Sequence, residues 1–367
     1  MDAKSSNPPH VNLQWIFTIS KFLGVSVLHT TTFNKFYSLL IQCLSIPCLI
    51  VWCVNSGVFR NDLNGITKGV LHVLTTYSST ILVVRGWRQT NRVLKAINCL
   101  NEFEYEMAHT HIDKVLSCGT LMYFLTLVCI DLELETVLSS QYLVHLESWA
   151  FYIPLLQMMM VANQFMGLVK HVDLSLSCLL KQLKSPDQTP SKELLKSYHQ
   201  LYDVSKLIDD AFSLQNLILI IHHVFATTFS MYYFFEAIMH LYPSSSVKKR
   251  IWLNLATYIL YFSCICLKFA LCQTVQSKAK DFKETLYDKI FNDSQEAQTL
   301  ALRPLYKKIK FSAFDVLDMD FKALKAIIMT IVTYQVILLQ FTVSNPSTDK
   351  KDFHNNSSSL EQNRSRS

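Results

Sequence analysis

The last strongly apolar run of the chain, residues 324–343, carries polar side chains that could act on an ion or a ligand. Residues at i, i+3, i+4 and i+7 share one face of a helix. One such stripe consists of Thr333, Val336, Ile337 and Gln340. Two interpretations are open. These groups could form hydrogen bonds between helices of one chain, or several subunits could present them as a ring of neutral dipoles that adjacent apolar residues close by dewetting.

The apolar residues that surround this stripe belong to a chain built for lipid. Of its 367 residues, 50% are hydrophobic, 12% aromatic and 17% charged. A helix needs about 20 mostly apolar residues to cross a bilayer core about 30 Å thick. Seven runs qualify: 37–54, 69–84, 115–130, 149–169, 214–241, 251–275 and 324–343. They are continuous and do not alternate as barrel strands do, so the sequence predicts an all-α polytopic membrane protein with seven transmembrane helices.

The distribution of Lys and Arg predicts the orientation of these helices. Cytoplasmic connections of membrane proteins carry the excess of positive charge. The N-terminal segment and the three connections on its side hold more than twice as many Lys and Arg residues as the four parts on the other side. We therefore expect a cytoplasmic N-terminus and an extracellular C-terminus. A G-protein-coupled receptor has the opposite orientation.

Three regions follow from this topology. Residues 1–36 form a cytoplasmic segment in which 13–28, with Lys21 at its middle, is predicted as an interfacial amphipathic helix. Residues 37–343 form the transmembrane domain, whose long cytoplasmic connections, 170–213 and 276–323, show helical patterns that extend the spans beyond the lipid. Residues 344–367 form a polar, Ser-rich extracellular tail predicted to be disordered.

The cytoplasmic connections contain no enzymatic signature. Both are too short for a catalytic domain, and neither has a Gly-rich phosphate loop, a nucleophile elbow or a paired metal motif. Cys264 and Cys266 lack the spacing of zinc ligands. We expect no enzyme, no cofactor and no metal site. The net charge of +6 comes from the cytoplasmic face and does not predict nucleic-acid binding.

The outer halves of the predicted spans carry aromatic and polar side chains suited to a small amphipathic ligand. The candidates for ligand contact are His72, Tyr123, Tyr152, Tyr233, Glu236, Trp252, Asn254, Tyr258 and Tyr261. Tyr and Trp near the ends of spans also form interfacial belts. Both interpretations are open at this point.

The segment from Thr333 to Phe341, TYQVILLQF, resembles the TYhhhhhQF signature of insect gustatory receptors, where h is hydrophobic. The preceding FSAFDVLDMDF, residues 311–321, is similar to the segment that leads into that motif in the family. Length, span number and orientation also fit. The resemblance implies a ligand-gated cation channel in the plasma membrane of sensory neurons, assembled with related subunits as a homo- or hetero-tetramer in membrane lipid.

The resemblance also implies roles for individual residues. Gln340 and Phe341 map onto the pore constriction, with Thr333, Val336 and Ile337 lining the pore and Tyr334 packing the pore helix. The expected ligand is a small tastant, with bitter or deterrent compounds as the class. A sugar receptor of the same family, a G-protein-coupled receptor and a transporter are the alternatives. Gln335 stands where the sugar-sensing branch usually has an acidic residue, which disfavours a sugar receptor.

Overall fold

The computed structural model describes residues 16–18, 20–21, 35–43, 63–103, 142–185, 191–239, 245–291 and 307–344. The predicted span 115–130 with its candidate Tyr123 and the tail from residue 345 onward lie outside these ranges.

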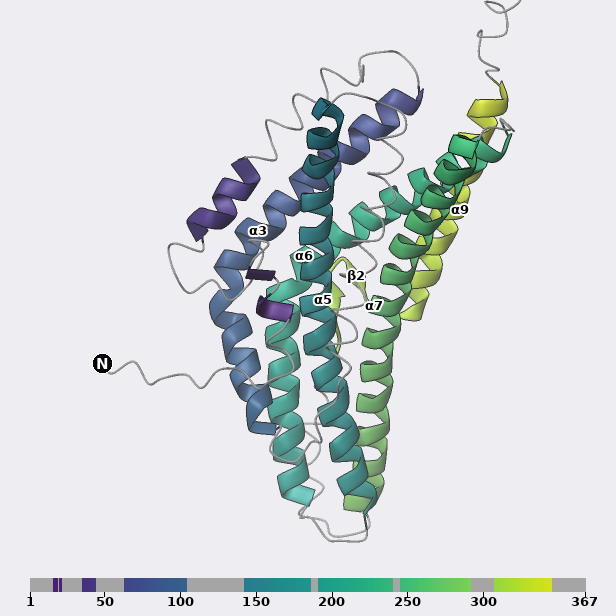
Figure 1. Cartoon of the computed structure of the whole chain (residues 1–367). Coiled ribbons are helices and arrows are strands. Elements are labelled where there is room, and N and C mark those ends of the chain that lie inside the picture. The colour runs from purple at the N-terminus through teal and green to yellow at the C-terminus, as the bar shows by residue number, and fades with distance from the viewer. Residues whose placement is uncertain are drawn as a thin grey trace, which may run out of the picture.

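Long helices dominate the structure (Figure 1). They are α3 (Leu63–Phe103), α5 (Tyr142–Lys184), α6 (Ser191–Met239), α7 (Ser245–Phe291) and α9 (Phe321–Ser344). The first four have 41 to 49 residues, and at 1.5 Å per residue each is roughly 60 to 75 Å long. Such a helix is about twice as long as a bilayer core is thick. Each therefore combines a span with an extension into water.

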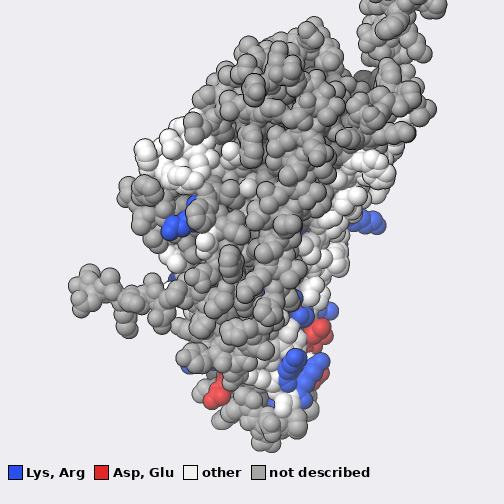
Figure 2. Space-filling view, in the orientation of Figure 1, with Lys and Arg blue, Asp and Glu red and all other residues white. Residues whose placement is uncertain are grey.

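The long helices continue beyond the predicted spans. α5 runs on from the predicted span 149–169 to Lys184, and α6 begins at Ser191, well before the span 214–241. α7 likewise continues beyond residue 275 to Phe291. The end of α5, the start of α6 and the end of α7 lie together at the lower end of the molecule in Figure 1. On the face shown in Figure 2, charged side chains gather toward this end, and the flank over α7 and α9 above it is mostly without them.

By length and composition alone, two of the described helices contain a stretch able to cross a membrane. These stretches fall within Glu193–Phe235 of α6 and Phe321–Gln340 of α9.

Aromatic packing holds the helices together where the predicted spans pass into their extensions. The ring of Phe165 on α5 lies 5.7 Å from that of Phe212 on α6 and 6.0 Å, edge-on, from that of Phe311. Tyr198 on α6 stacks on Phe282 on α7 with ring centroids 5.0 Å apart. These five side chains are at most 1% exposed. Burial of an aromatic side chain contributes about 2 to 3 kcal/mol, so this cluster is a major source of stability.

Residues 307–320 approach α9 through a small β-hairpin. β1 (Ser312–Ala313) pairs antiparallel with β2 (Leu317–Asp318), and the Met319 N–H donates to the Phe311 carbonyl at 2.9 Å. Phe314 and Asp315 at the tip both have positive φ, 56° and 54°. The Val316 N–H closes the turn on the Ala313 carbonyl at 3.1 Å. Left-handed conformations at two successive residues characterise the type I′ turn, which usually selects Asn and Gly.

The N-terminal segment contributes to the core. Ile16 and Phe17 are 0% and 5% exposed and belong to the same hydrophobic cluster as the long helices, whereas Lys21 is exposed. In the described part of this segment, the apolar side chains therefore pack on protein while Lys21 is exposed.

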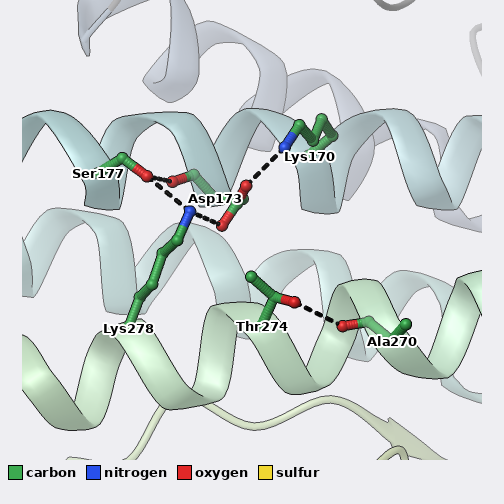
Figure 3. Close-up of polar contacts among 6 residues, drawn as sticks. All are labelled: Lys170, Asp173, Ser177, Ala270, Thr274 and Lys278. Carbon is green, nitrogen blue, oxygen red and sulfur yellow. Dashed lines mark hydrogen bonds and ion pairs between the residues drawn. The ribbon is translucent and has the colours of Figure 1, made fainter.

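A buried ion cluster joins α5 to α7 near the predicted inner membrane boundary. Lys278 on α7 donates to Asp173 Oδ1 at 2.5 Å and to Ser177 Oγ at 2.7 Å, and Lys170 contacts Asp173 Oδ2 at 2.7 Å. Figure 3 shows Lys278 reaching across to Asp173 and Ser177. The Asp173 side chain is 3% exposed, while the two lysine side chains are 28% and 31% exposed. The carboxylate thus offsets two partly buried cations.

We predict that Asp173→Ala destabilises the purified receptor, because it leaves two partly buried ammonium groups without their counter-charge. Breaking a buried ion pair by removing one partner costs about 3 kcal/mol or more, so Tm should fall by at least about 5 °C. The control is Glu284→Ala, which removes one partner of an exposed ion pair, Lys280–Glu284 at 3.5 Å. Exposed pairs contribute less than about 1 kcal/mol. Equal Tm values for the two variants would contradict the role given to Asp173.

Candidate functional site

α9 begins at a defined N-cap that ties it to α7. The carboxylate of Asp320 accepts from the Ala323 N–H at 2.8 Å, as an N-cap side chain does. Two glutamines of α7 contact the same turn: Gln273 accepts from the Phe321 N–H at 3.3 Å, and Gln276 donates to the Met319 carbonyl at 3.4 Å. The position of α9 along α7 is therefore set by hydrogen bonds to backbone atoms.

One face of α9 packs on the protein's own bundle. Every fourth residue from Ala323 to Gln335 is buried, with exposures of 9%, 9%, 4% and 5% for Ala323, Ile327, Ile331 and Gln335. Residues spaced by four lie on one side of a helix, and α9 contacts α6 and α7. This stripe is the contact surface that fixes the rotation of α9.

Gln335 makes a polar contact at the end of that stripe. Its side-chain amide donates to the carbonyl of Thr228 on α6, while the Thr228 hydroxyl donates back to the Val224 carbonyl at 2.8 Å. A polar group in a membrane interior must find a partner within protein. Within the described part of the chain, Gln335 and not Gln340 is thus the glutamine of the TYQVILLQF segment that forms an interhelical hydrogen bond.

The predicted pore-lining stripe lies on the opposite side of α9. Thr333, Val336, Ile337 and Gln340 are all exposed in the single chain, Val336 by 50% and Ile337 by 39%. Among the described residues, the Thr333 hydroxyl bonds within its own helix, to the Met329 carbonyl at 2.8 Å. Tyr334 is 54% exposed, so packing of its ring would need a neighbouring subunit. Phe341 lies on α9, but its side chain is outside the described part.

The interior of the bundle contains a polar network that the sequence reading missed. Gln42 donates to Gln157 on α5 at 2.7 Å, and Thr80 on α3 donates to Gln42 at 3.0 Å. The Ser79 hydroxyl also donates to Gln157. The sequence did contain a sign of this network, the run of Thr and Ser residues within the span 69–84. Of that run, Thr75, Thr76, Ser78 and Ser79 are all buried in the structure. Such groups in a span face protein or an internal cavity.

Close to this network lies a buried cluster of aromatic and polar side chains from three helices. We call it the central chamber and define it by Thr75 of α3, His222 and His223 of α6, and Tyr261 of α7. Thr75 Oγ1 lies 3.0 Å from His222 Nε2, and the Tyr261 ring centroid lies 5.8 and 5.6 Å from those of His222 and His223. All four side chains are at most 2% exposed.

The chamber has unused hydrogen-bonding capacity. Among the described residues, His222 Nδ1 and His223 Nε2 of the chamber have no hydrogen-bond partner although they are buried, and neither has the hydroxyl of Thr227, one turn further along α6. Buried polar atoms in native proteins are nearly always satisfied by protein, by water or by a ligand. Such atoms are available to hydrogen-bond a water molecule or a polar group of a small compound.

The residues predicted to contact a ligand differ in burial and do not form one cluster in the described part of the chain. Tyr261 lies in the central chamber, while His72, Tyr233 and Tyr258 are partly buried on α3, α6 and α7. Tyr258 stacks on Phe262 with centroids 5.8 Å apart. Trp252 is 69% exposed, as a residue of an interfacial belt would be. Three candidates lie on described helices with side chains outside the described part: Tyr152, Glu236 and Asn254.

A carboxylate of α6 holds the hairpin that leads into α9. Asp209 accepts from the Ser312 N–H at 2.6 Å and from its hydroxyl at 3.1 Å. Burial raises the pKa of Asp209 from 3.8 to about 6, although both Ser312 hydrogen bonds favour the ionised form; the nearby carboxylates of Asp210 and Asp315 raise the pKa further. We refer to this contact of Asp209 with Ser312 as the hairpin latch.

Comparison with known proteins agrees with this geometry. Residues 13–345 match the family profile of the 7tm chemosensory receptors. The chain belongs to this family, which confirms the predicted relation to insect gustatory receptors. It is a multi-pass membrane chemosensory receptor and not an enzyme. No curated protein matches the chain.

Solved structures show the same fold. The insect olfactory receptor OR5 from Machilis hrabei is similar with a TM-score of 0.67 at 15% identity, over 90% of this chain and 97% of that receptor. The structure of the same receptor in complex with eugenol gives a TM-score of 0.64 at 15% identity, over 90% and 98%. The all-helical, seven-helix prediction is confirmed.

We predict that the hairpin latch gives stability a pH dependence. Because the pKa of Asp209 in the folded state lies above its ordinary value, the carboxyl favours folding most below pH 3.8, and this contribution declines as the pH rises through about 6. The Tm of wild type minus that of Asp209→Asn should therefore fall between about pH 4.5 and 6.5 and then level off. Thermal unfolding across this range checks it. Asp203→Asn, at an exposed position of α6, is the control. If the Tm of wild type minus that of Asp209→Asn rose with pH, the raised pKa of Asp209 would be contradicted.

Proposed function

We propose that this chemosensory receptor is a ligand-gated, non-selective cation channel whose pore is lined by the exposed face of α9 from several copies or related subunits. The observation that carries the proposal is the exposure of Gln340 on the face of α9 opposite the bundle. An amide in the outer part of a span is costly against lipid and requires water or protein. A central axis shared by four subunits would provide both.

The composition of this face suits a gate. Val336 and Ile337 stand one turn before Gln340 and are half-exposed. Apolar constrictions close a pore by dewetting, and neutral amide dipoles interact with cations without trapping them. In the tetramer we propose, Val336 and Ile337 form the closed constriction, and Gln340 with Phe341 forms the outer ring.

The central chamber is the proposed ligand site, supported by its buried aromatic rings and unused polar atoms. The olfactory receptor of known structure binds a small odorant, eugenol. We propose a small amphipathic ligand here as well, with a bitter or deterrent compound as the tastant class. His222 and His223 lie within two helical turns of Thr228, the residue that contacts Gln335. One helix, α6, therefore connects the chamber with the pore helix.

The environment of Gln335 bears on the sugar-receptor alternative. The position is 5% exposed, and its amide donates to a backbone carbonyl. An ionised acidic side chain has no proton to donate and would face the carbonyl oxygen with like partial charge. The acidic residue usual in the sugar-sensing branch therefore does not fit this contact, which supports a different ligand class.

We predict that cells expressing the receptor give a ligand-evoked cation current in excised patches without GTP, and that Gln340→Ala changes its relative permeability. The reason is that Gln340 offers its amide directly to passing ions. A panel of sugars and bitter alkaloids supplies the ligand, and reversal potentials with small and large cations give the permeability. Gln200→Ala is the matched control, because that glutamine is exposed near the start of α6 and has no part in the contacts of α9 described above.

Three outcomes would contradict the proposal. A response that requires GTP would indicate a G-protein-coupled receptor. A permeability that is the same in wild type and Gln340→Ala would remove α9 from the ion path, and saturable uptake without conductance would indicate a transporter.

A further inference from the structure

A groove on the outside of the bundle lies apart from the pore face and the central chamber. Its walls come from one side of α3 and from Leu214 of α6, and its volume is about 420 Å³. Tyr77, Ile81 and Val84 line its apolar part, and Arg85 with Arg88 line one end. We call it the α3 groove.

The apolar wall follows the helical period of α3. Tyr77, Ile81, Val84 and Arg88 share one face, and the three apolar residues are 70%, 37% and 38% exposed. The opposite face, with Thr75, Ser79 and Leu82, is buried in the bundle. From Tyr77 to Arg88 the helix rises about 16 Å, close to the thickness of one leaflet of a bilayer core. The groove therefore has the length of a lipid chain.

A hydrogen bond between α3 and α6 fixes the relative position of the two helices that form the groove. The side chain of Gln215, next to Leu214, donates to the Leu82 carbonyl on α3 at 3.4 Å. This hydrogen bond holds α6 against α3 behind the groove. The space between the helices is thus part of the folded structure.

The positive end of the groove lies at the predicted inner membrane boundary, because Arg85 follows directly on the span 69–84. Gln89, with its amide in the orientation that its surroundings require, accepts from Arg85 Nε at 3.2 Å and from Nη2 at 3.0 Å and so positions that guanidinium. Neither arginine forms an ion pair with a carboxylate in the described part of the chain. Two guanidinium groups here lack a described counter-charge.

We propose that the α3 groove binds an anionic phospholipid of the inner leaflet, with its phosphate on Arg85 and Arg88 and one acyl chain along Tyr77, Ile81, Val84 and Leu214. Guanidinium groups bind phosphate oxygens through paired charge-assisted hydrogen bonds. Basic pockets between transmembrane helices on the cytoplasmic side suit the head groups of anionic lipids. An apolar groove at membrane depth on the lipid-facing side selects a lipid over a soluble anion.

The test measures which lipids stay bound to the intact receptor. Wild type is reconstituted in nanodiscs of phosphatidylcholine and phosphatidylserine in equal parts, and the lipids retained on release are identified by native mass spectrometry. We expect wild type to retain phosphatidylserine in preference to phosphatidylcholine. In R85Q/R88Q the preference should fall at least about tenfold, since each lost charged hydrogen bond weakens binding by about that factor.

Two further variants separate a defined site from a diffuse effect. R92Q/K95Q removes two exposed positive charges further along the same helix, outside the groove, and should keep the wild-type preference. Val84→Trp fills the groove without changing its charge, and this variant should lose the preference for phosphatidylserine. Size-exclusion chromatography verifies that each variant is folded. A wild type without preference, equal loss in R92Q/K95Q, or full retention in Val84→Trp would each overturn the proposal.

Discussion

The requirement that polar groups in a membrane interior find partners within protein or water determines how α9 sits. Gln335 meets this requirement through the backbone of Thr228, and this contact together with the stripe from Ala323 to Ile331 fixes the rotation of the helix. The same rotation turns Gln340 away from the bundle. In a lone subunit surrounded by lipid, the amide of Gln340 would face hydrocarbon without a partner. The proposed assembly around a water-filled axis gives this amide water, and the need for it arises from the rotation that the Gln335 contact sets.

The part of the bundle around the hairpin supplies the fixed base for this arrangement. The aromatic cluster of Phe165, Phe212 and Phe311 and the hairpin latch hold the hairpin against α5 and α6, and the glutamines of α7 hold the first turn of α9. Above this base, α9 contacts α6 and α7 through side chains of one stripe. Its lower end is thus tied through backbone hydrogen bonds, while its upper part is held mainly by side-chain packing.

Much of the architecture could be predicted because it rests on local patterns. Continuous apolar runs indicated the spans, and helical spacing beyond them indicated the extensions of α5, α6 and α7. The face of α9 that packs on the bundle could not be predicted, because the helix is apolar on most sides and no single stripe stands out. Only the contact with Thr228 distinguishes Gln335 from Gln340.

The interior polar groups were missed for a related reason. Gln42, Ser79 and Gln157 look like interruptions of three separate spans, and their meaning depends on partners 78 and 115 residues apart in the chain. The pairing of Thr75 with His222 spans 147 residues. The hairpin before α9 also lacks the Asn-Gly signal of its turn type, since Phe314 and Asp315 take the left-handed positions.

The central claim is that the exposed face of α9 lines the ion path and its buried stripe does not. Cysteine modification tests it most directly, with Val336→Cys on the exposed face and Ile331→Cys on the buried stripe, each treated with a cationic methanethiosulfonate reagent during ligand-evoked current. The account predicts that the reagent reduces the current of Val336→Cys, faster with ligand present, and leaves Ile331→Cys at the wild-type background. An unchanged current in Val336→Cys together with block of Ile331→Cys would contradict it.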